Sequence, residues 1–278
     1  MYSGRLWHSV GFMLETRSLS RSYDGTTVVD EVSFEVKPGR MTGFVGANGA
    51  GKTTTMRMIV GVLAPSAGEV LWNGAPVTTA QRRRFGYMPE ERGLYPRMKI
   101  AEQLVFFARL HGFSTADASR RAQELLEHFD LDERRNDELD KLSLGNQQRV
   151  QIAAALIHRP EALILDEPFS GLDPLAVDSM VELLKGQDAE VPLLFSSHQL
   201  ELVERLCDDL VILSAGREWR PERSTNCVAV GPIVIGSSSM RQMPPGCVKS
   251  GALSSGTSMA RRHSSTSTAR PLRHCWRR

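Results

Sequence analysis

The sequence feature that most constrains the fold is a glycine-rich octapeptide near residue 50. It reads Gly46-Ala47-Asn48-Gly49-Ala50-Gly51-Lys52-Thr53 and matches the phosphate-loop pattern G-x-x-x-x-G-K-[ST]. A short apolar run at 41–45 precedes it, and apolar residues at helical spacing follow it at 53–63. Strand, glycine-rich loop and helix in this order open a parallel α/β domain. The alternative is a tight glycine turn that only joins a strand to a helix.

The residue types of this loop suit phosphate binding. Glycines let backbone N–H groups turn toward phosphate oxygens, and the N-terminus of the following helix adds a partial positive charge. We expect the Lys52 ammonium to reach the β- and γ-phosphates of ATP and the Thr53 hydroxyl to ligate Mg²⁺. The residues of this segment assigned to nucleotide binding are Gly46, Asn48, Gly49, Gly51, Lys52, Thr53 and Thr54.

A second motif pairs an apolar strand with two carboxylates. Residues 162–168 read Ala-Leu-Ile-Leu-Asp-Glu-Pro. A strand buried on both faces excludes charge until its carboxyl edge, where phosphate loops lie in such sheets. We expect Asp166 to hold Mg²⁺ through water and Glu167 to polarise the water that attacks the γ-phosphate. The alternative is an acidic helix N-terminus, since Asp before Glu-Pro suits a cap.

The remaining periodicity predicts an α/β fold with three parts. Alternating residues at 13–45 and a strand and turn at 70–74 predict an N-terminal antiparallel β subdomain of short strands. Helical spacing at 100–111, 115–129 and 146–158 predicts a helical subdomain at about 95–160. Apolar runs at 162–165, 192–196 and 210–213, separated by helices, complete a mainly parallel sheet.

Composition excludes several classes of protein. The chain has 278 residues, 41% hydrophobic and 24% charged, which is ordinary for a globular protein. No run approaches the roughly 18 apolar residues of a membrane helix, so we expect any membrane function to come from a partner. The cysteines form no C-x-x-C pair and read as free thiols in a reducing cytosol: Cys207, Cys227, Cys247 and Cys275.

The C-terminal segment is far more basic than the rest of the chain. Residues 219–278 contain ten Lys or Arg and one acidic residue; subtraction from the totals of 34 and 32 leaves 24 basic and 31 acidic residues in 1–218, a net charge of −7. A mildly acidic body gives no support for nucleic-acid binding.

Residues 1–12 make no convincing signal peptide. Because a strand-like pattern begins at Met13, we expect the natural start there and treat 1–12 as an extension.

One motif indicates a particular family among the proteins with a phosphate loop. It reads Leu142-Ser143-Leu144-Gly145-Asn146-Gln147-Gln148-Arg149 and resembles the ABC (ATP-binding cassette) signature motif, usually LSGGQ. Other motifs of that family follow the same order: Tyr23, Tyr87-Met88-Pro89-Glu90 at the Q-loop, Ser170-Gly171-Leu172-Asp173 at the D-loop, and Ser197-His198. The resemblance covers 13–217, and it implies an ABC ATP-binding domain with a P-loop NTPase (RecA-like) core.

The resemblance also implies roles and partners. Tyr23 would stack on adenine, and His198 would act with Glu167 in hydrolysis. The other implied nucleotide contacts are Glu90, which would also ligate Mg²⁺, and Ser143, Gly145, Gln147 and Asp173. The implied protein is the ATPase of a transporter, at the cytoplasmic face of the cell membrane, paired with a second ATP-binding subunit and a membrane permease. We expect no nucleic-acid partner, and the Pro-Glu-Glu-Arg-Gly-Leu run at 89–94 is similar to bacterial exporters.

Two positions depart from the family pattern. Glu90 stands where the Q-loop usually has glutamine, and it adds negative charge beside Asp166 and Glu167. In the signature, Leu144 replaces the first glycine and Asn146 precedes the glutamine. Since Ser143 and Gly145 remain, we expect retained function with altered affinity. The competing interpretations are a soluble ABC ATPase of translation or repair, and an inactive nucleotide-binding remnant.

The C-terminal segment 218–278 is predicted to be disordered or out of frame. Periodicity stops after Arg217, and Ser, Gly, Pro and Arg dominate. Back-translation from the last base of the Glu218 codon, with CGN codons for arginine, permits V-A-T-G-T-V-D-E-L-R, which is similar to the continuation in the family. We therefore expect a frameshift near codon 218. A genuine basic tail that binds acidic lipid or nucleic acid is the alternative, and resequencing decides between them.

Overall fold

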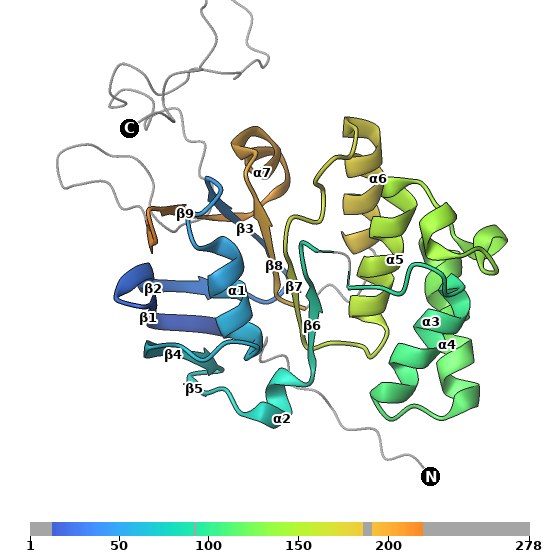
Figure 1. Ribbon diagram of the computed structural model, residues 1–278, viewed down its shortest axis with the longest axis horizontal. Helices are drawn as coiled ribbons and strands as arrows, with labels where there is room; N and C mark the ends of the chain where they lie inside the picture. Colours follow the sequence, from blue (N-terminus) through green and yellow to red (C-terminus); the bar gives the residue numbers. More distant parts are fainter. Residues whose placement is uncertain (1–12, 92, 186–190, 219–278) are drawn as a thin grey trace, which may run out of the picture. The chain divides into compact units, whose positions relative to one another are not determined.

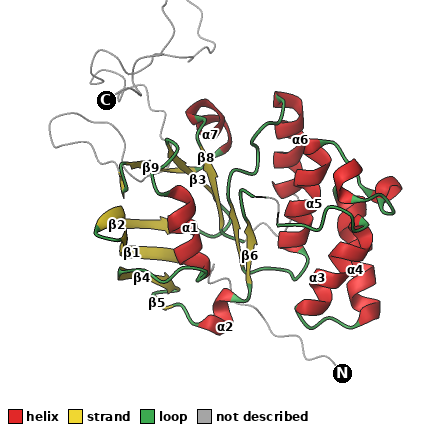
Figure 2. Cartoon of the chain, in the orientation of Figure 1, coloured by secondary structure: helices red, strands yellow, loops and turns green. Residues whose placement is uncertain are grey.

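The structure is a computed structural model that describes residues 13–91, 93–185 and 191–218 (Figure 1). The predicted extension at 1–12 lies outside the described residues, and so do residues 219–278 of the predicted tail. Within the described part, strands form two sheets, and the long helices α3 to α5 gather in a separate region (Figure 2). None of the described helices is both long and apolar enough to cross a membrane.

The larger sheet is the mainly parallel sheet that the sequence predicts. Its six strands run in the order β10-β9-β3-β8-β7-β6, and every neighbouring pair is parallel except β10 with β9. Their bounds are β3 Met41–Gly46, β6 Phe85–Met88, β7 Ala162–Leu165, β8 Leu193–Ser197, β9 Asp209–Ser214 and β10 Arg217–Glu218. All residues of β3, β7 and β8 are buried, as expected for strands covered on both faces.

The smaller sheet is antiparallel, in the order β2-β1-β4-β5. Its strands are β1 Leu14–Tyr23, β2 Thr26–Val36, β4 Ala67–Trp72 and β5 Ala75–Pro76. The expectation of short strands is wrong for β1 and β2, which have 10 and 11 residues. Register shifts between Thr16 and Ser22 explain the error. They absorb the polar residues that interrupt the alternation, so one long twisted pair replaces several short strands.

The helices lie close to their predicted positions. In the helical region α3 spans Ile100–Leu110, α4 spans Thr115–His128 and α5 spans Leu144–Leu156, with two 3₁₀ turns, Asp132–Arg134 and Leu139–Lys141, between α4 and α5. The others are α1 Lys52–Val60, α2 Thr79–Arg82, α6 Pro174–Lys185 and α7 Leu200–Leu206. Only α2 was not anticipated; a Thr78–Gln81 capping box starts it.

Two hydrophobic clusters cover opposite faces of the large sheet. Alternate residues of β7 show the division: Leu163 and Leu165 belong to the cluster with α3, α4, α5 and α6, whereas Ala162 and Ile164 belong to the cluster with α1 and the small sheet. The large sheet is therefore covered by hydrophobic side chains on both faces. Cys207 is a free thiol, and burial raises its pKa; the other cysteines lie outside the described residues.

Candidate functional site: a phosphate loop facing two carboxylates

The glycine-rich loop runs from the end of β3 to the start of α1. Gly49 and Gly51 have positive φ angles of 81° and 97°, in the left-handed region that favours glycine. A Cβ added to Gly46 would lie 2.6 Å from the Leu213 carbonyl oxygen. Asn48 and Gly49 are exposed, so their backbone can face a ligand. This conformation supports a phosphate loop over a plain connecting turn.

Lys52 is the first residue of α1, and its side chain is buried. The ammonium donates hydrogen bonds to the Gly46 carbonyl at 2.7 Å and to the Ala47 carbonyl at 3.4 Å, and it lies 3.6 Å from Glu167 Oε1. A buried ammonium needs such partners because desolvation is costly. Thr53 and Thr54 follow on the first turn of α1, half-buried.

The two carboxylates follow β7 directly. Asp166 is fully buried and Glu167 nearly so. The Ser196 hydroxyl, on the neighbouring strand β8, donates to Asp166 Oδ1 at 2.6 Å and accepts from the Glu167 N–H at 2.8 Å. Asp166 Oδ2 has no hydrogen-bond partner among the described residues. The alternative of a helix cap is wrong, since the next described helix, α6, begins only at Pro174.

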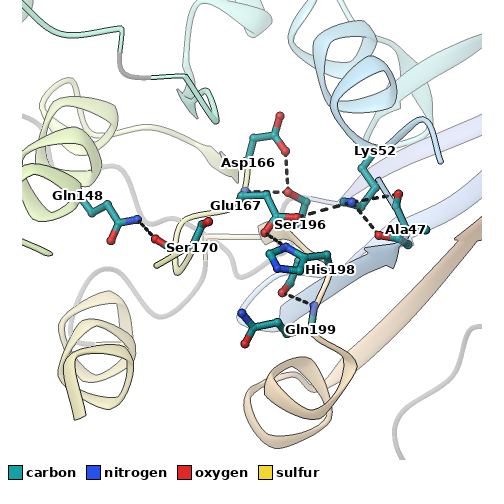
Figure 3. A network of polar contacts seen from close by, with 11 residues as sticks. Ala47, Lys52, Gln148, Asp166, Glu167, Ser170, Ser196, His198 and Gln199 are labelled. Atoms are coloured by element: carbon teal, nitrogen blue, oxygen red, sulfur yellow. Dashed lines mark hydrogen bonds and ion pairs between the residues drawn. The ribbon is translucent and has the colours of Figure 1, made fainter. Parts of the chain in front are cut away.

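Glu167 is held in an uncommon backbone conformation. Its φ is 51°, a left-handed value that costs a non-glycine residue about 1–3 kcal/mol. Its carboxylate lies between two basic groups: Oε1 faces Lys52, and Oε2 is 3.0 Å from His198 Nδ1 (Figure 3). Because β3, β8 and β7 are adjacent in the sheet, Lys52, His198 and Glu167 meet at the carboxyl ends of these strands.

Comparison with known proteins decides the family. The family model described as "ABC transporter" matches residues 29–170. YhaQ, an ABC transporter ATP-binding protein of Bacillus subtilis, is 44% identical over 206 residues, covering 74% of this chain and 69% of the relative. The chain belongs to the ABC transporter family. It is an ATP-binding subunit, and the homologous domains of this family are ATPases coupled to transport.

Two further similarities support this membership. The Nod factor export ATP-binding protein I of Cupriavidus metallidurans is 38% identical over 210 residues, covering 74% of this chain and 69% of the relative. A solved structure of the ATP-binding subunit of an ABC transporter has a TM-score of 0.68 and 36% identity, covering 80% of this chain and 90% of that one. The predicted family and fold class are both confirmed.

The ABC motifs at the rim of the site lie on exposed positions. Tyr23 ends β1, is 42% exposed, and carries the Arg21 guanidinium 4.6 Å from its ring centroid. Glu90 is exposed two residues after β6. Neither is hydrogen-bonded or ion-paired to Lys52, Glu167 or His198 within the part of the chain that the structure describes, so their nucleotide contacts remain predictions.

The signature residues of this ABC cassette form the start of α5. Ser143 is the N-cap: its hydroxyl accepts from the Asn146 N–H at 3.4 Å, and the residue is exposed. Gly145 is half-buried, whereas Gln147 is buried and donates to the Leu142 carbonyl at 2.9 Å. The Gln147 side chain is therefore engaged in a hydrogen bond with a neighbouring residue of the same chain, whereas Ser143 is exposed.

The sequence did not predict three hydrogen-bonded contacts of this site. Asp173, predicted to contact nucleotide, accepts from the Ala176 N–H at 2.9 Å at the start of α6. Ser196, which joins the Asp166 carboxylate to the Glu167 backbone N–H, was not anticipated; a hydroxyl within the apolar run of β8 was the available signal. Gln148 Nε2 donates to the Ser170 carbonyl at 2.7 Å, a contact between distant segments that no sequence pattern announces.

Proposed function

We propose that this ABC cassette, residues 13–217, works as one of a pair that binds two ATP molecules between its members and drives export through a separate membrane subunit. The observation that carries the proposal is the division of the site. Lys52, Glu167 and His198 form one polar cluster, whereas Ser143 caps a different, exposed helix start. A head-to-tail pair brings the helix start of one chain to the phosphate loop of the other.

We propose that Mg²⁺ binds beside the phosphates, held by Thr53, Asp166 and Glu90. One observation supports this: Asp166 Oδ2 is buried without a hydrogen-bond partner among the described residues. Mg²⁺ typically takes one or two protein carboxylates and fills its other positions with water and substrate phosphate. When bound, it would neutralise charge on the phosphates.

In this proposal the chain's own groups act on water and phosphate. Glu167 accepts a proton from the attacking water, whose oxygen bonds to the γ-phosphorus as the bond to the β-phosphate oxygen breaks, leaving ADP and phosphate. His198, 3.0 Å from Glu167, orients that carboxylate. Lys52 exchanges its carbonyl partners for phosphate oxygens. Loss of the γ-phosphate removes the contact between the two chains, so the pair opens.

We propose that the cassette binds a membrane permease, on the basis of its family and of a groove in the structure. A groove of about 280 Å³ lies between β6 and helices α3 and α5. Leu94, which follows Glu90, and the aromatic Phe107 line it, together with the buried Gln151, whose Nε2 lacks a described partner. We infer that this groove faces the permease, at the cytoplasmic side of the membrane. Similarity to a Nod factor export protein supports export as the direction.

Glu167→Gln tests the proposal. The variant should hydrolyse ATP about 100-fold more slowly or worse, because the amide cannot take the proton. It should still bind Mg·ATP and should elute as a dimer in size-exclusion chromatography with ATP. Glu161→Gln is the matched control, since Glu161 precedes the same strand and forms an exposed ion pair with Arg84 at 2.7 Å, away from the phosphate loop. Full hydrolysis by Glu167→Gln refutes the catalytic role, and a monomer with ATP refutes the pairing.

Two further observations separate the alternatives. Co-purification of the native chain with a membrane protein supports the transporter, whereas co-purification with ribosomes supports a soluble ABC ATPase. A wild-type chain that binds Mg·ATP but never hydrolyses it supports a nucleotide-binding remnant.

A further inference from the structure

The start of α5 and the turn formed by residues 170–172 are interlocked within one chain. A Cβ added to Gly171 would lie 2.8 Å from Leu144 Cδ2, and a Cβ added to Gly145 would lie 3.4 Å from Leu172 Cδ2. Gly171 therefore leaves room for Leu144, and Gly145 lies at van der Waals distance from Leu172. Leu144 is 37% exposed, so this contact lies at the surface, where hydrophobic-core packing does not require it.

A hydrogen bond joins the same two segments. Gln148, one helical turn after Leu144, donates through Nε2 to the Ser170 carbonyl at 2.7 Å (Figure 3). Gln148 is 6% exposed, whereas Ser170, which supplies the accepting carbonyl, is exposed. The turn is thus held to α5 at two neighbouring points, one apolar and one polar.

The turn is hydrogen-bonded to the backbone of Glu167, the residue whose carboxylate faces Lys52. The Ser170 N–H donates to the Glu167 carbonyl at 3.2 Å, and the Leu172 N–H donates to the Phe169 carbonyl at 3.3 Å. Glu167 itself has a φ of 51°. A strained residue keeps such a conformation only when its surroundings over-determine it. Ser196 holds the Glu167 N–H on one side, and the turn holds its carbonyl on the other.

We propose that Leu144 and Gln148 are positioning residues that hold the 170–172 turn and, through it, the backbone of Glu167. Leu144 stands where the usual ABC signature has glycine, so the apolar half of this clamp comes from a departure of this chain. In the proposed pair, the same helix start carries Ser143 toward the partner's ATP. The clamp then links one ATP site to the catalytic carboxylate of the other, and this last consequence rests on the proposed function.

The test is steady-state ATP hydrolysis by the full chain carrying Leu144→Ala. We expect kcat to fall about tenfold, because displacing a reacting group by a fraction of an ångström slows the chemical step, while KM stays within about twofold. Leu144→Met, which conserves volume, should restore kcat to within about twofold of wild type. The matched control is Leu110→Ala, which removes the same atoms from an exposed position on α3 and should leave kcat unchanged.

Gln148→Ala provides a second, independent variant and should show the same split between kcat and KM. An unchanged kcat in both variants overturns the inference, and so does a loss of activity that appears entirely in KM. Leu144→Ala combined with Glu167→Gln should still dimerise with ATP. If Glu167→Gln alone fails to dimerise, the proposed pairing is wrong, but the positioning role still depends only on the kcat measurements.

Discussion

Removing the Ser196 hydroxyl should lower the free energy of unfolding of this cassette substantially, because this one oxygen makes two buried hydrogen bonds. The hydroxyl is fully buried, donates to Asp166 Oδ1 at 2.6 Å and accepts from the Glu167 N–H at 2.8 Å. A hydrogen bond to a charged group contributes about 1.5–3 kcal/mol, and a buried orphaned N–H costs about 1–3 kcal/mol. Allowing for relaxation, we expect Ser196→Ala to lower the free energy of unfolding by about 2–4 kcal/mol.

Urea unfolding at pH 7, monitored by far-UV circular dichroism without nucleotide and with EDTA, measures this loss. In a domain of this size, 1 kcal/mol corresponds to a change in Tm of about 2–4 °C, so Tm should fall by about 4–16 °C. The denaturant slope should not change, because the variant buries the same surface.

Ser197→Ala is the matched control for Ser196→Ala. Ser197 is the next residue of the same strand and is 3% exposed, but among the described residues its hydroxyl accepts one hydrogen bond, from the Gln199 N–H at 3.0 Å. Losing that single bond should cost about 0.5–1.5 kcal/mol. If Ser196→Ala costs no more than Ser197→Ala, the Asp166 carboxylate and the Glu167 N–H do not depend on the hydroxyl, and the reasoning is refuted.

Two further predictions concern the packing behind the site. Burial and the neighbouring His111 lower the pKa of His158 to about 4, so the unfolded state binds more protons between pH 4 and 6.5 and stability falls as pH drops through this window. His158→Gln should therefore reduce the loss of stability between pH 7 and pH 5 by about 2 kcal/mol; an identical pH profile in urea unfolding contradicts this. Gly86→Ala should cost about 1–3 kcal/mol, because its Cβ would lie 2.4 Å from the Ala155 carbonyl oxygen. Gly93→Ala, whose nearest atom is 3.6 Å away, should shift Tm by at most a degree or two; equal losses would show that the contact does not matter.

Features that depend on neighbours along the chain were predictable. The glycines of the phosphate loop, the apolar run before Asp166 and the helical spacing of 100–129 all encode local conformation. The helix expected to begin at residue 146 starts two residues earlier, because the Ser143 cap draws Leu144 and Gly145 into its first turn. Strands β1 and β2 were misjudged in length for a related reason, since their bulges depend on pairing with each other.

The sequence by itself determined which residue types this cassette brings to phosphate chemistry. An ammonium in a glycine loop, paired carboxylates at a strand end and a histidine after another strand carry their chemistry wherever they lie. Only the tertiary structure decided how they meet: the order β3-β8-β7 places Lys52, His198 and Glu167 together, and it sets Ser196 against the Asp166 carboxylate and the Glu167 backbone N–H. The contact of Leu144 with Gly171 likewise joins segments far apart in sequence. Such pairings depend on packing across elements, which no local pattern of side chains specifies.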